Sequence, residues 1–147
     1  MTLPTHILLG SIIGQLTGNL VLAIAVSVLV DIDHLYSYIK SKVIFSPRKF
    51  WKTVTDKNDP YGDQRGYLHN VIVAGIISVI VWLALPLVGL TFALAYFGHL
   101  LLDALDKSDY WPLFPNKKIN ITGFVGYFSP GEVMIDVGLV VLLIILI

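Results

Sequence analysis

The chain has 147 residues, of which 56% are hydrophobic and only 14% are charged, and its mean hydropathy is +0.79. Soluble domains contain about 45–50% apolar and about 25% charged residues, so this composition indicates a membrane protein. The formal net charge of zero argues against a nucleic-acid partner, and the lack of cysteine excludes disulfides and thiolate metal sites. The length fits a single domain over residues 1–147.

Five apolar segments predict an all-α membrane bundle of about five helices. Turn signals and prolines separate the segments, which cover residues 4–16, 20–39, 67–85, 87–105 and 130–147. A membrane-spanning helix needs about 20 residues, and the first and last segments are shorter than that. We therefore expect three to five of these helices to cross the bilayer.

The charged side chains gather in two long connections. Every Lys and Arg lies within residues 40–65 or 107–118, whereas the short turns 16–20 and 85–90 carry no charge. On helices that run up and down, the two long connections share one side, which the positive-inside rule assigns to the cytoplasm of a multi-pass inner-membrane protein. The stretch SPRKFWK (46–52) fits either an interfacial helix that meets anionic lipids or a solvated basic loop.

All four histidines belong to the same end of the predicted bundle. His6 begins the first segment, His34 lies late in the second, His69 begins the third, and His99 lies late in the fourth. Starts and ends of antiparallel helices fall at the same height, so these side chains should converge. The carboxylates expected at that height are Asp31, Asp33, Asp103, Glu132 and Asp136.

Local spacing supports a metal site at this end. His99 and Asp103 are four residues apart, and Asp31 and His34 are three apart, so each pair shares one helix face. Imidazole and carboxylate together favour Zn²⁺ over Mn²⁺ or Fe²⁺, and a bound water whose pKa falls to about 7 would supply a hydroxide nucleophile. The predicted metal ligands are His6, Asp31, His34, His69, His99 and Asp103.

Four further residues are candidates for catalysis: Asp33, Arg65, Glu132 and Asp136. Asp33 points away from the Asp31 face and is expected to orient a ligand or to serve a second metal. Glu132 fits two roles equally well: a general base, or the partner of Ser129 in an N-terminal capping box with Ser129 as the N-cap. Asp136 has no such capping role. Arg65 fits a clamp for a phosphoryl oxygen or a side chain that reaches lipid phosphate. Asp106 and Asp109 are expected to be solvated.

Four motifs in order, PTHILLGSIIG, DIDHL, RGYLHN and GHLLLDALDKSDYWPLFP, resemble the YdjM-like family of inner-membrane, metal-dependent hydrolases over residues 5–115. More remotely, they resemble the helical zinc-dependent phospholipase C enzymes. The resemblance implies hydrolysis of a phosphoester at the membrane. The ligand positions it implies are His34, His69, His99 and Asp103, with Asp31 or Asp33 between metals.

One motif departs from the family pattern H-R-G-x-T-H-S. The chain reads QRGYLHN there, with Gln64, Leu68 and Asn70 in place of His, Thr and Ser. The departure leaves open whether the chain holds one metal ion where relatives hold two, and whether it is active.

The leading hypothesis is a membrane-bound hydrolase that uses one or two Zn²⁺-type ions. Its expected substrate is a phosphoester in a lipid or lipid-linked molecule, and its expected partners are membrane lipids. One alternative is a proton or metal-ion transporter that uses the same His/Asp cluster. The apolar far end of the bundle offers few polar groups for such a path. The other alternative is a non-catalytic membrane scaffold.

Overall fold

The computed structural model describes residues 1–55 and 65–147. The regular elements within these ranges are helices, and the ranges contain two isolated β-bridges but no strand. The all-α class is therefore confirmed. The elements are α1 (Leu3–Thr17), α2 (Leu20–Leu29), α3 (Ile32–Lys40), α4 (Pro47–Thr55), the 3₁₀ turn η1 (Tyr67–His69), α5 (Val71–Ala84), α6 (Pro86–Leu105) and α7 (Pro130–Leu146).

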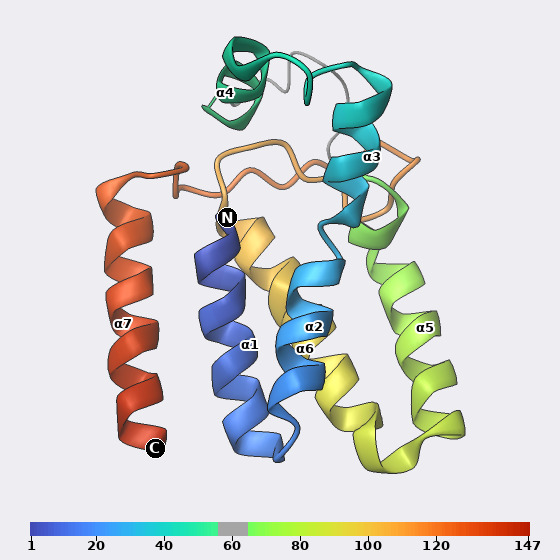
Figure 1. Ribbon diagram of the computed structural model, residues 1–147. Coiled ribbons are helices and arrows are strands. Elements are labelled where there is room, and N and C mark those ends of the chain that lie inside the picture. The colour runs from blue at the N-terminus through green and yellow to red at the C-terminus, as the bar shows by residue number, and fades with distance from the viewer. Residues whose placement is uncertain (56–64) are drawn as a thin grey trace.

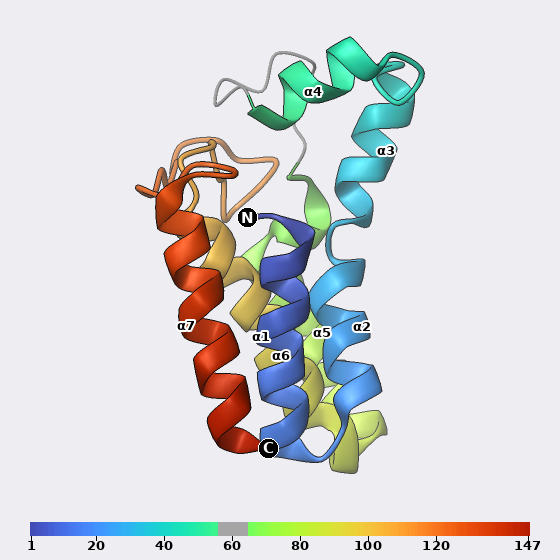
Figure 2. The ribbon, with the colours of Figure 1, turned by 60° about the vertical axis from the view of Figure 1, so that its left-hand side comes forward.

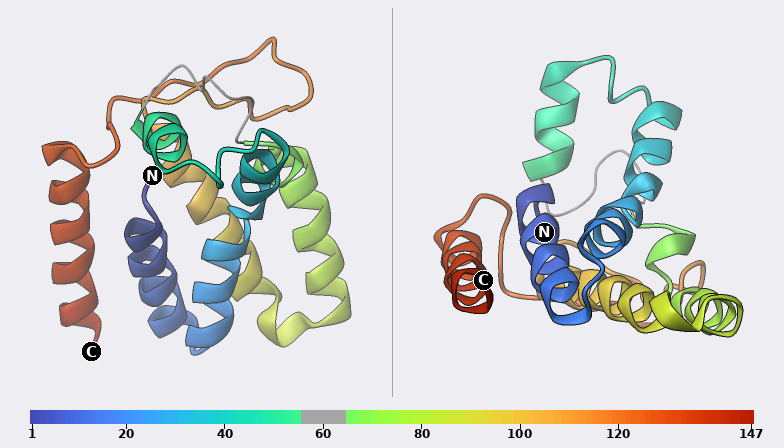
Figure 3. Two further views of the ribbon diagram at one scale, coloured as in Figure 1. Left: turned by 45° about the horizontal axis from the view of Figure 1, so that its top comes forward. Right: turned by 60° about the horizontal axis from the view of Figure 1, so that its bottom comes forward.

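Helices α1, α2, α5, α6 and α7 run side by side (Figures 1 and 2). The right-hand view in Figure 3 places α7 and α5 on opposite sides of the bundle, with α1, α2 and α6 between them. Helix α3 rises above α2, and α4 lies across the top of the molecule (Figure 1). We call this end, which carries α3, α4, η1 and residues 106–129, the polar end.

Two helical stretches, Leu20–Lys40 and Pro86–Leu105, are long and apolar enough to cross a membrane. The first combines α2 and α3, which the structure separates at residues 30–31. Asp31 stands at this interruption, where its backbone C=O accepts a hydrogen bond from the His34 N–H at 3.0 Å. The apolar pattern predicts one continuous helix over 20–39. The interruption arises because Asp31 turns its carboxylate toward histidines of other elements. The total number of crossings stays a prediction.

Two glycines let α1 and α2 approach closely. A Cβ atom added at Gly14 would lie 2.5 Å from the Cα of Leu20, and one at Gly10 would lie 2.9 Å from the Cα of Ile24. Small residues at such positions allow helix backbones in membranes to come together. This approach sets the upper turn of α1, which carries His6, beside the junction of α2 and α3.

Side-chain hydrogen bonds fix the short turn η1 at the polar end. The Tyr96 hydroxyl of α6 donates to the Leu68 C=O at 2.8 Å. Asn70 caps α5, since its Oδ1 accepts from the N–H groups of Ile72 (2.7 Å) and Val73 (3.1 Å). His69 lies between these anchors, so its ring is held in place. Asn70, one of the departures from the family pattern, thus stabilises the helix start that follows His69.

Candidate metal centre

The structure brings all six predicted metal ligands together at the polar end. They form two overlapping groups, and within each group the ligand atoms lie within 4.8 Å of one another. The first group is His6, Asp31, His99 and Asp103, and the second is Asp31, His34, His69 and Asp103. Asp31 and Asp103 belong to both groups. These ligands come from α1, the α2–α3 junction, α3, η1 and α6.

The distances at the middle of the cluster fit a metal ion. Asp103 Oδ2 lies 3.1 Å from His69 Nε2 and 3.5 Å from His99 Nε2, and the two Nε2 atoms are 3.3 Å apart. Asp31 Oδ1 lies 3.4 Å from His99 Nε2 and 3.7 Å from His69 Nε2. Ligand bonds of about 2.0–2.1 Å around tetrahedral Zn²⁺ place ligand atoms about 3.3–3.4 Å apart. The observed spacing is close to that value.

The Nδ1 atoms of His99 and His69, which face away from the cluster, each hydrogen bond to an oxygen acceptor. His99 Nδ1 lies 2.6 Å from the Ser27 C=O of α2, and His69 Nδ1 lies 3.3 Å from Asp33 Oδ2. A carbonyl or carboxylate oxygen only accepts, so each Nδ1 carries a proton, and when the ring is neutral its Nε2 presents a lone pair to Asp31 and Asp103. Metal-ligating histidines are held in this way by partners on their far nitrogen.

His6 and His34, in contrast, have buried ring nitrogens without a hydrogen-bond partner among the described residues. The His6 ring stacks on His99 with centroids 3.9 Å apart, and His6 Nε2 lies 3.5 Å from Asp103 Oδ1. Within the described residues, three buried nitrogens have no hydrogen-bond partner: both ring nitrogens of His6 and Nε2 of His34. Leaving buried polar atoms unpaired is costly, and a cation shared with the carboxylates would satisfy them.

Arg65 forms ion pairs with Asp103, a member of both ligand groups, and with Asp106. Arg65 Nε contacts Asp103 Oδ2 at 3.0 Å, and Arg65 Nη2 lies 3.4 Å from Asp106 Oδ2. The amino group of Met1 contacts Asp103 Oδ1 at 3.0 Å and Asp106 Oδ2 at 2.8 Å. Asp106 is buried, so the expectation that it is solvated is wrong. Its backbone is held as well, since the Gly123 N–H donates to the Asp106 C=O at 2.7 Å.

The charges of the cluster do not cancel. Asp31, Asp33, Asp103 and Asp106 face two cationic groups, Arg65 and the Met1 amino group, which leaves two negative charges when the histidines are neutral. Burial alone would lower the pKa of His69, but hydrogen bonds to Asp103, Asp31 and Asp33 raise it to about 10. A proton on His69 offsets half of this excess and a divalent cation offsets all of it, so the two should compete.

The predicted catalytic residues lie in different surroundings. Asp33 belongs to neither group, but besides His69 its Oδ2 accepts the N–H groups of Gly66 (3.1 Å) and Leu68 (2.8 Å). This contact fits an orienting role. Gln64, the remaining departure from the family pattern, lies outside the described residues.

Glu132 and Asp136 lie on α7 and belong to neither group of ligands. Glu132 is buried and accepts the N–H of Thr2 at 2.6 Å and of Phe128 at 2.7 Å. The Ser129 hydroxyl caps the Glu132 N–H at 3.3 Å, which confirms Ser129 as the N-cap of α7. Within the described part of the chain, Asp136 Oδ1 is buried without a hydrogen-bond partner.

In the described part of the chain the regular elements are helices, two helical stretches are long and apolar enough to cross a membrane, and a His/Asp cluster offers a candidate metal site. These features fit a membrane protein with a metal centre. The chain belongs to the YdjM inner membrane protein family, which matches it over residues 1–147. The resemblance seen in its motifs is thereby confirmed for the whole chain. No curated protein and no solved structure matches the chain.

Proposed function

We propose that this chain is a membrane-bound hydrolase that holds one or two divalent cations of the Zn²⁺ type and cleaves a phosphoester in a lipid or lipid-linked substrate. One observation carries the proposal. The Nε2 lone pairs of His69 and His99 face two carboxylates, and each Nδ1 is tied to an acceptor. Four acceptors turned toward one another are stable only with a cation or a proton between them.

The overlap of the two groups supports a two-ion version. Asp31 and Asp103 are shared, as carboxylates that bridge two metals would be, and all six ligand positions are present. Two-metal hydrolases hold their ions about 3.5–4 Å apart. The loss of a family histidine at position 64 favours a single ion instead. Metal stoichiometry decides between them.

A divalent cation held here supplies Lewis-acid stabilisation for the charge on a phosphoryl oxygen. In the overall reaction the bond between phosphorus and the ester oxygen breaks. The oxygen and one hydrogen of water end on the phosphoryl group, and the other hydrogen ends on the leaving alcohol. In this proposal Asp33 and the Ser27 carbonyl orient His69 and His99, so that their Nε2 atoms stay aimed at the site.

The roles of Arg65 and Glu132 differ from the sequence-based hypothesis. Arg65 is buried, and its nitrogens contact Asp103, Asp106 and the C=O groups of Ser108 and Asp109. We therefore assign it the positioning of Asp103 rather than a clamp on the phosphoryl group. Glu132 is assigned a structural role that joins the start of α7 to the start of α1. Asp33 is likewise assigned a positioning role in place of a general base, because its Oδ2 already accepts three hydrogen bonds.

The non-catalytic scaffold is favoured by one observation of its own. His69 Nε2 lies 3.1 Å from Asp103 Oδ2, and the hydrogen bonds to carboxylates raise the pKa of His69 to about 10, so a proton can close the cluster without any metal. In that case the carboxylates, His69 and Arg65 would serve only to join the helix ends. The transporter alternative gains no comparable support, because the turns 16–20 and 85–90 at the far end carry no charged residue. We place the cluster on the cytoplasmic side of a multi-pass inner-membrane bundle, from the distribution of Lys and Arg.

Metal analysis of the purified full-length chain tests the proposal. The wild type should carry about one or two equivalents of transition metal, and His99→Ala and Asp103→Asn should lose most of it. Asp109→Asn is the matched control, because Asp109 lies near Asp103 in sequence but belongs to neither group of ligands. A wild type with no bound metal, equal to His99→Ala, would overturn the proposal and favour the scaffold.

A further inference from the structure

A cavity of about 400 Å³ opens onto the metal ligands that are least buried. His6, His69 and His99 have no exposed surface and Asp103 is 1% exposed, but the side chains of Asp31 and His34 are 24% and 15% exposed. Asp31 and His34 both line this cavity. A molecule that reaches the cluster therefore meets these two ligands first, and the volume is within the range of about 300–1,000 Å³ typical of ligand pockets.

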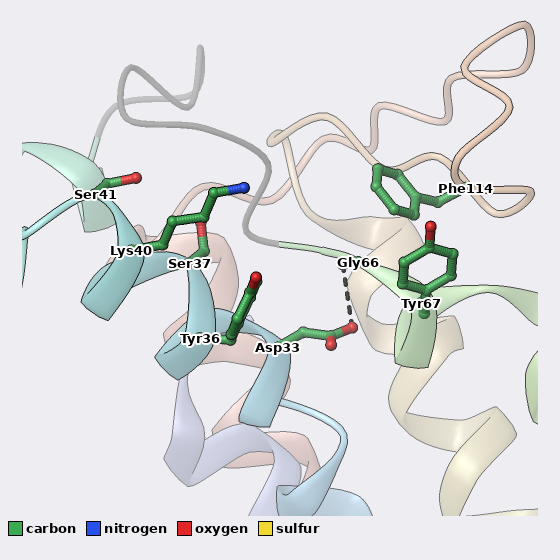
Figure 4. A pocket seen from close by; sticks show the side chains of 8 residues that line it. All are labelled: Asp33, Tyr36, Ser37, Lys40, Ser41, Gly66, Tyr67 and Phe114. Atoms are coloured by element: carbon green, nitrogen blue, oxygen red, sulfur yellow. Dashed lines mark hydrogen bonds between the residues drawn. The ribbon is translucent and has the colours of Figure 1, made fainter.

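A second cavity of about 470 Å³, on the other face of α3, contrasts with the first. Its walls include Tyr36, Ser37, Lys40 and Tyr67, and the carboxylate at its base is Asp33, which hydrogen bonds to the Gly66 N–H (Figure 4). Asp33 is not a member of either group of ligands. The second cavity thus reaches an orienting residue, whereas the first cavity reaches the ligands themselves.

Apolar and aromatic side chains form the walls and rim of the first cavity. Phe50 of α4 packs edge-on against Tyr38 of α3, with ring centroids 5.5 Å apart. Trp51 of α4 stacks on Phe128, with ring centroids 6.0 Å apart. Trp51 is 62% exposed, Phe128 61% and Leu3 50%, so the rim is apolar where it meets the surroundings. Such a rim suits a lipid environment and would be unfavourable in water.

Helix α4 has the character of a helix that lies at a membrane surface. Phe50 and Trp51 turn toward the cavity, whereas the basic residues Arg48 and Lys52 of the same helix are exposed. In Figures 1 and 2 the helix lies across the top of the bundle rather than along it. A basic, aromatic helix in this orientation binds at the level of anionic headgroups, with its apolar face toward the acyl chains.

We propose that this cavity binds a phosphate-bearing membrane lipid, with one hydrocarbon chain between α4, α3 and the start of α1 and with the phosphoester at Asp31 and His34. The inference rests on the proposed function and deepens it, because it names the cavity that binds the lipid substrate and the side from which the lipid arrives. The lipid leaves the bilayer at the exposed rim formed by Leu3, Trp51 and Phe128. Its chain replaces water along an apolar wall, and its phosphate comes to the only ligands of the cluster that are open to this cavity.

Quenching of Trp51 fluorescence tests the proposal. The full chain carries three tryptophans, so Trp82→Phe with Trp111→Phe leaves Trp51 as the single reporter. A second variant, Trp51→Phe with Trp111→Phe, leaves Trp82, which is exposed on α5 away from the cavity. The probe is brominated diacyl phosphatidic acid, added to each protein in excess detergent. We expect Trp51 quenching to saturate near one lipid per chain and Trp82 quenching to rise linearly with lipid.

Two substitutions separate the cavity from the general lipid surface. Phe50→Ala should weaken the saturable binding about tenfold, the change expected from the loss of one aromatic wall. Phe45→Ala is the matched control, because Phe45 is an exposed aromatic residue on the same connection that does not line the cavity. Brominated diacylglycerol, which lacks the phosphate, should bind the metal-loaded protein at least about tenfold more weakly.

The proposal is overturned if Trp51 quenching is linear like that of Trp82, or if Phe45→Ala weakens binding as much as Phe50→Ala. It is also overturned if diacylglycerol binds the metal-loaded protein as tightly as phosphatidic acid. Failure of the proposed function gives a different result. Saturable, Phe50-dependent quenching would then persist in a protein whose cluster takes up no metal.

Discussion

Replacing Asp33 tests whether the histidines of the cluster are held for a metal. Asp33 Oδ2 accepts three hydrogen bonds, from Gly66 N–H (3.1 Å), Leu68 N–H (2.8 Å) and His69 Nδ1 (3.3 Å). It is not itself a member of a ligand group. Any effect of its loss on metal binding must therefore act through the position and basicity of His69.

The size of the effect follows from these contacts. Loss of an outer partner of a ligating histidine lowers metal affinity about 10–100-fold. Asp33→Asn keeps an oxygen that can accept but removes the charge, which roughly halves the strength of such bonds, so we expect about a tenfold loss. Asp33→Ala also leaves two backbone N–H groups of η1 without their acceptor, so we expect a loss near 100-fold, or about 2.7 kcal/mol.

Competition between the purified protein and a chelator of known Zn²⁺ affinity measures these changes. Asp109→Asn is the control, since its carboxylate accepts from the Asn120 side chain at 2.7 Å and lies outside both groups. Unchanged affinity in both Asp33 variants would show that Asp33 does not hold His69 for a metal. An equal loss in Asp109→Asn would show the same, because a distant charge would then have the same effect.

Three further predictions follow from the structure. Glu132→Gln leaves one of two buried N–H groups facing an amide NH₂, so the free energy of unfolding should fall by about 1–3 kcal/mol in thermal unfolding while metal content is unchanged. Gly14→Val places side-chain atoms against the backbone of Leu20, so both the unfolding temperature and the metal content should fall. With a pKa of about 10, His69 must release a proton when a metal binds. Zn²⁺ affinity, measured by chelator competition between about pH 6 and pH 8, should therefore rise at least about tenfold per pH unit.

Each of these predictions has a contrary outcome. Loss of metal in Glu132→Gln at full stability would restore a role for Glu132 in the metal site. Wild-type stability in Gly14→Val would contradict the close approach of α1 and α2. A Zn²⁺ affinity that is independent of pH would show that His69 is already neutral in the metal-free protein, with no proton on Nε2.

The helices were largely predictable from the sequence, since apolar runs and proline or glycine punctuation mark their ends. The segment expected over 87–105 is α6 (Pro86–Leu105), and the one expected over 130–147 is α7 (Pro130–Leu146). The interruption at residues 30–31 was not predicted, because the apolar run continues through Val30. Its cause is a set of contacts from Asp31 to His69 and His99, which are distant in sequence.

The ligands of the candidate site were also predictable, but their supports were not. Spacing on one helix face and the alternation of helix ends bring His99, Asp103 and Asp31 together, as the groups of ligands show. The Ser27 carbonyl that holds His99 is a backbone group, so no residue type announces it. Asp106 looks like a loop residue in sequence, but it is buried and its carboxylate contacts Arg65 and the Met1 amino group, which are distant in sequence.

Anomalous X-ray scattering from crystals of the protein grown with Zn²⁺ shows whether the cluster binds a metal. We expect a peak at the zinc edge about 2.0–2.2 Å from His69 Nε2, His99 Nε2 and an oxygen of Asp103 or Asp31. A second peak beside His6 or His34 would establish the two-ion version. A cluster with no anomalous peak, in crystals that contain Zn²⁺, would contradict the account.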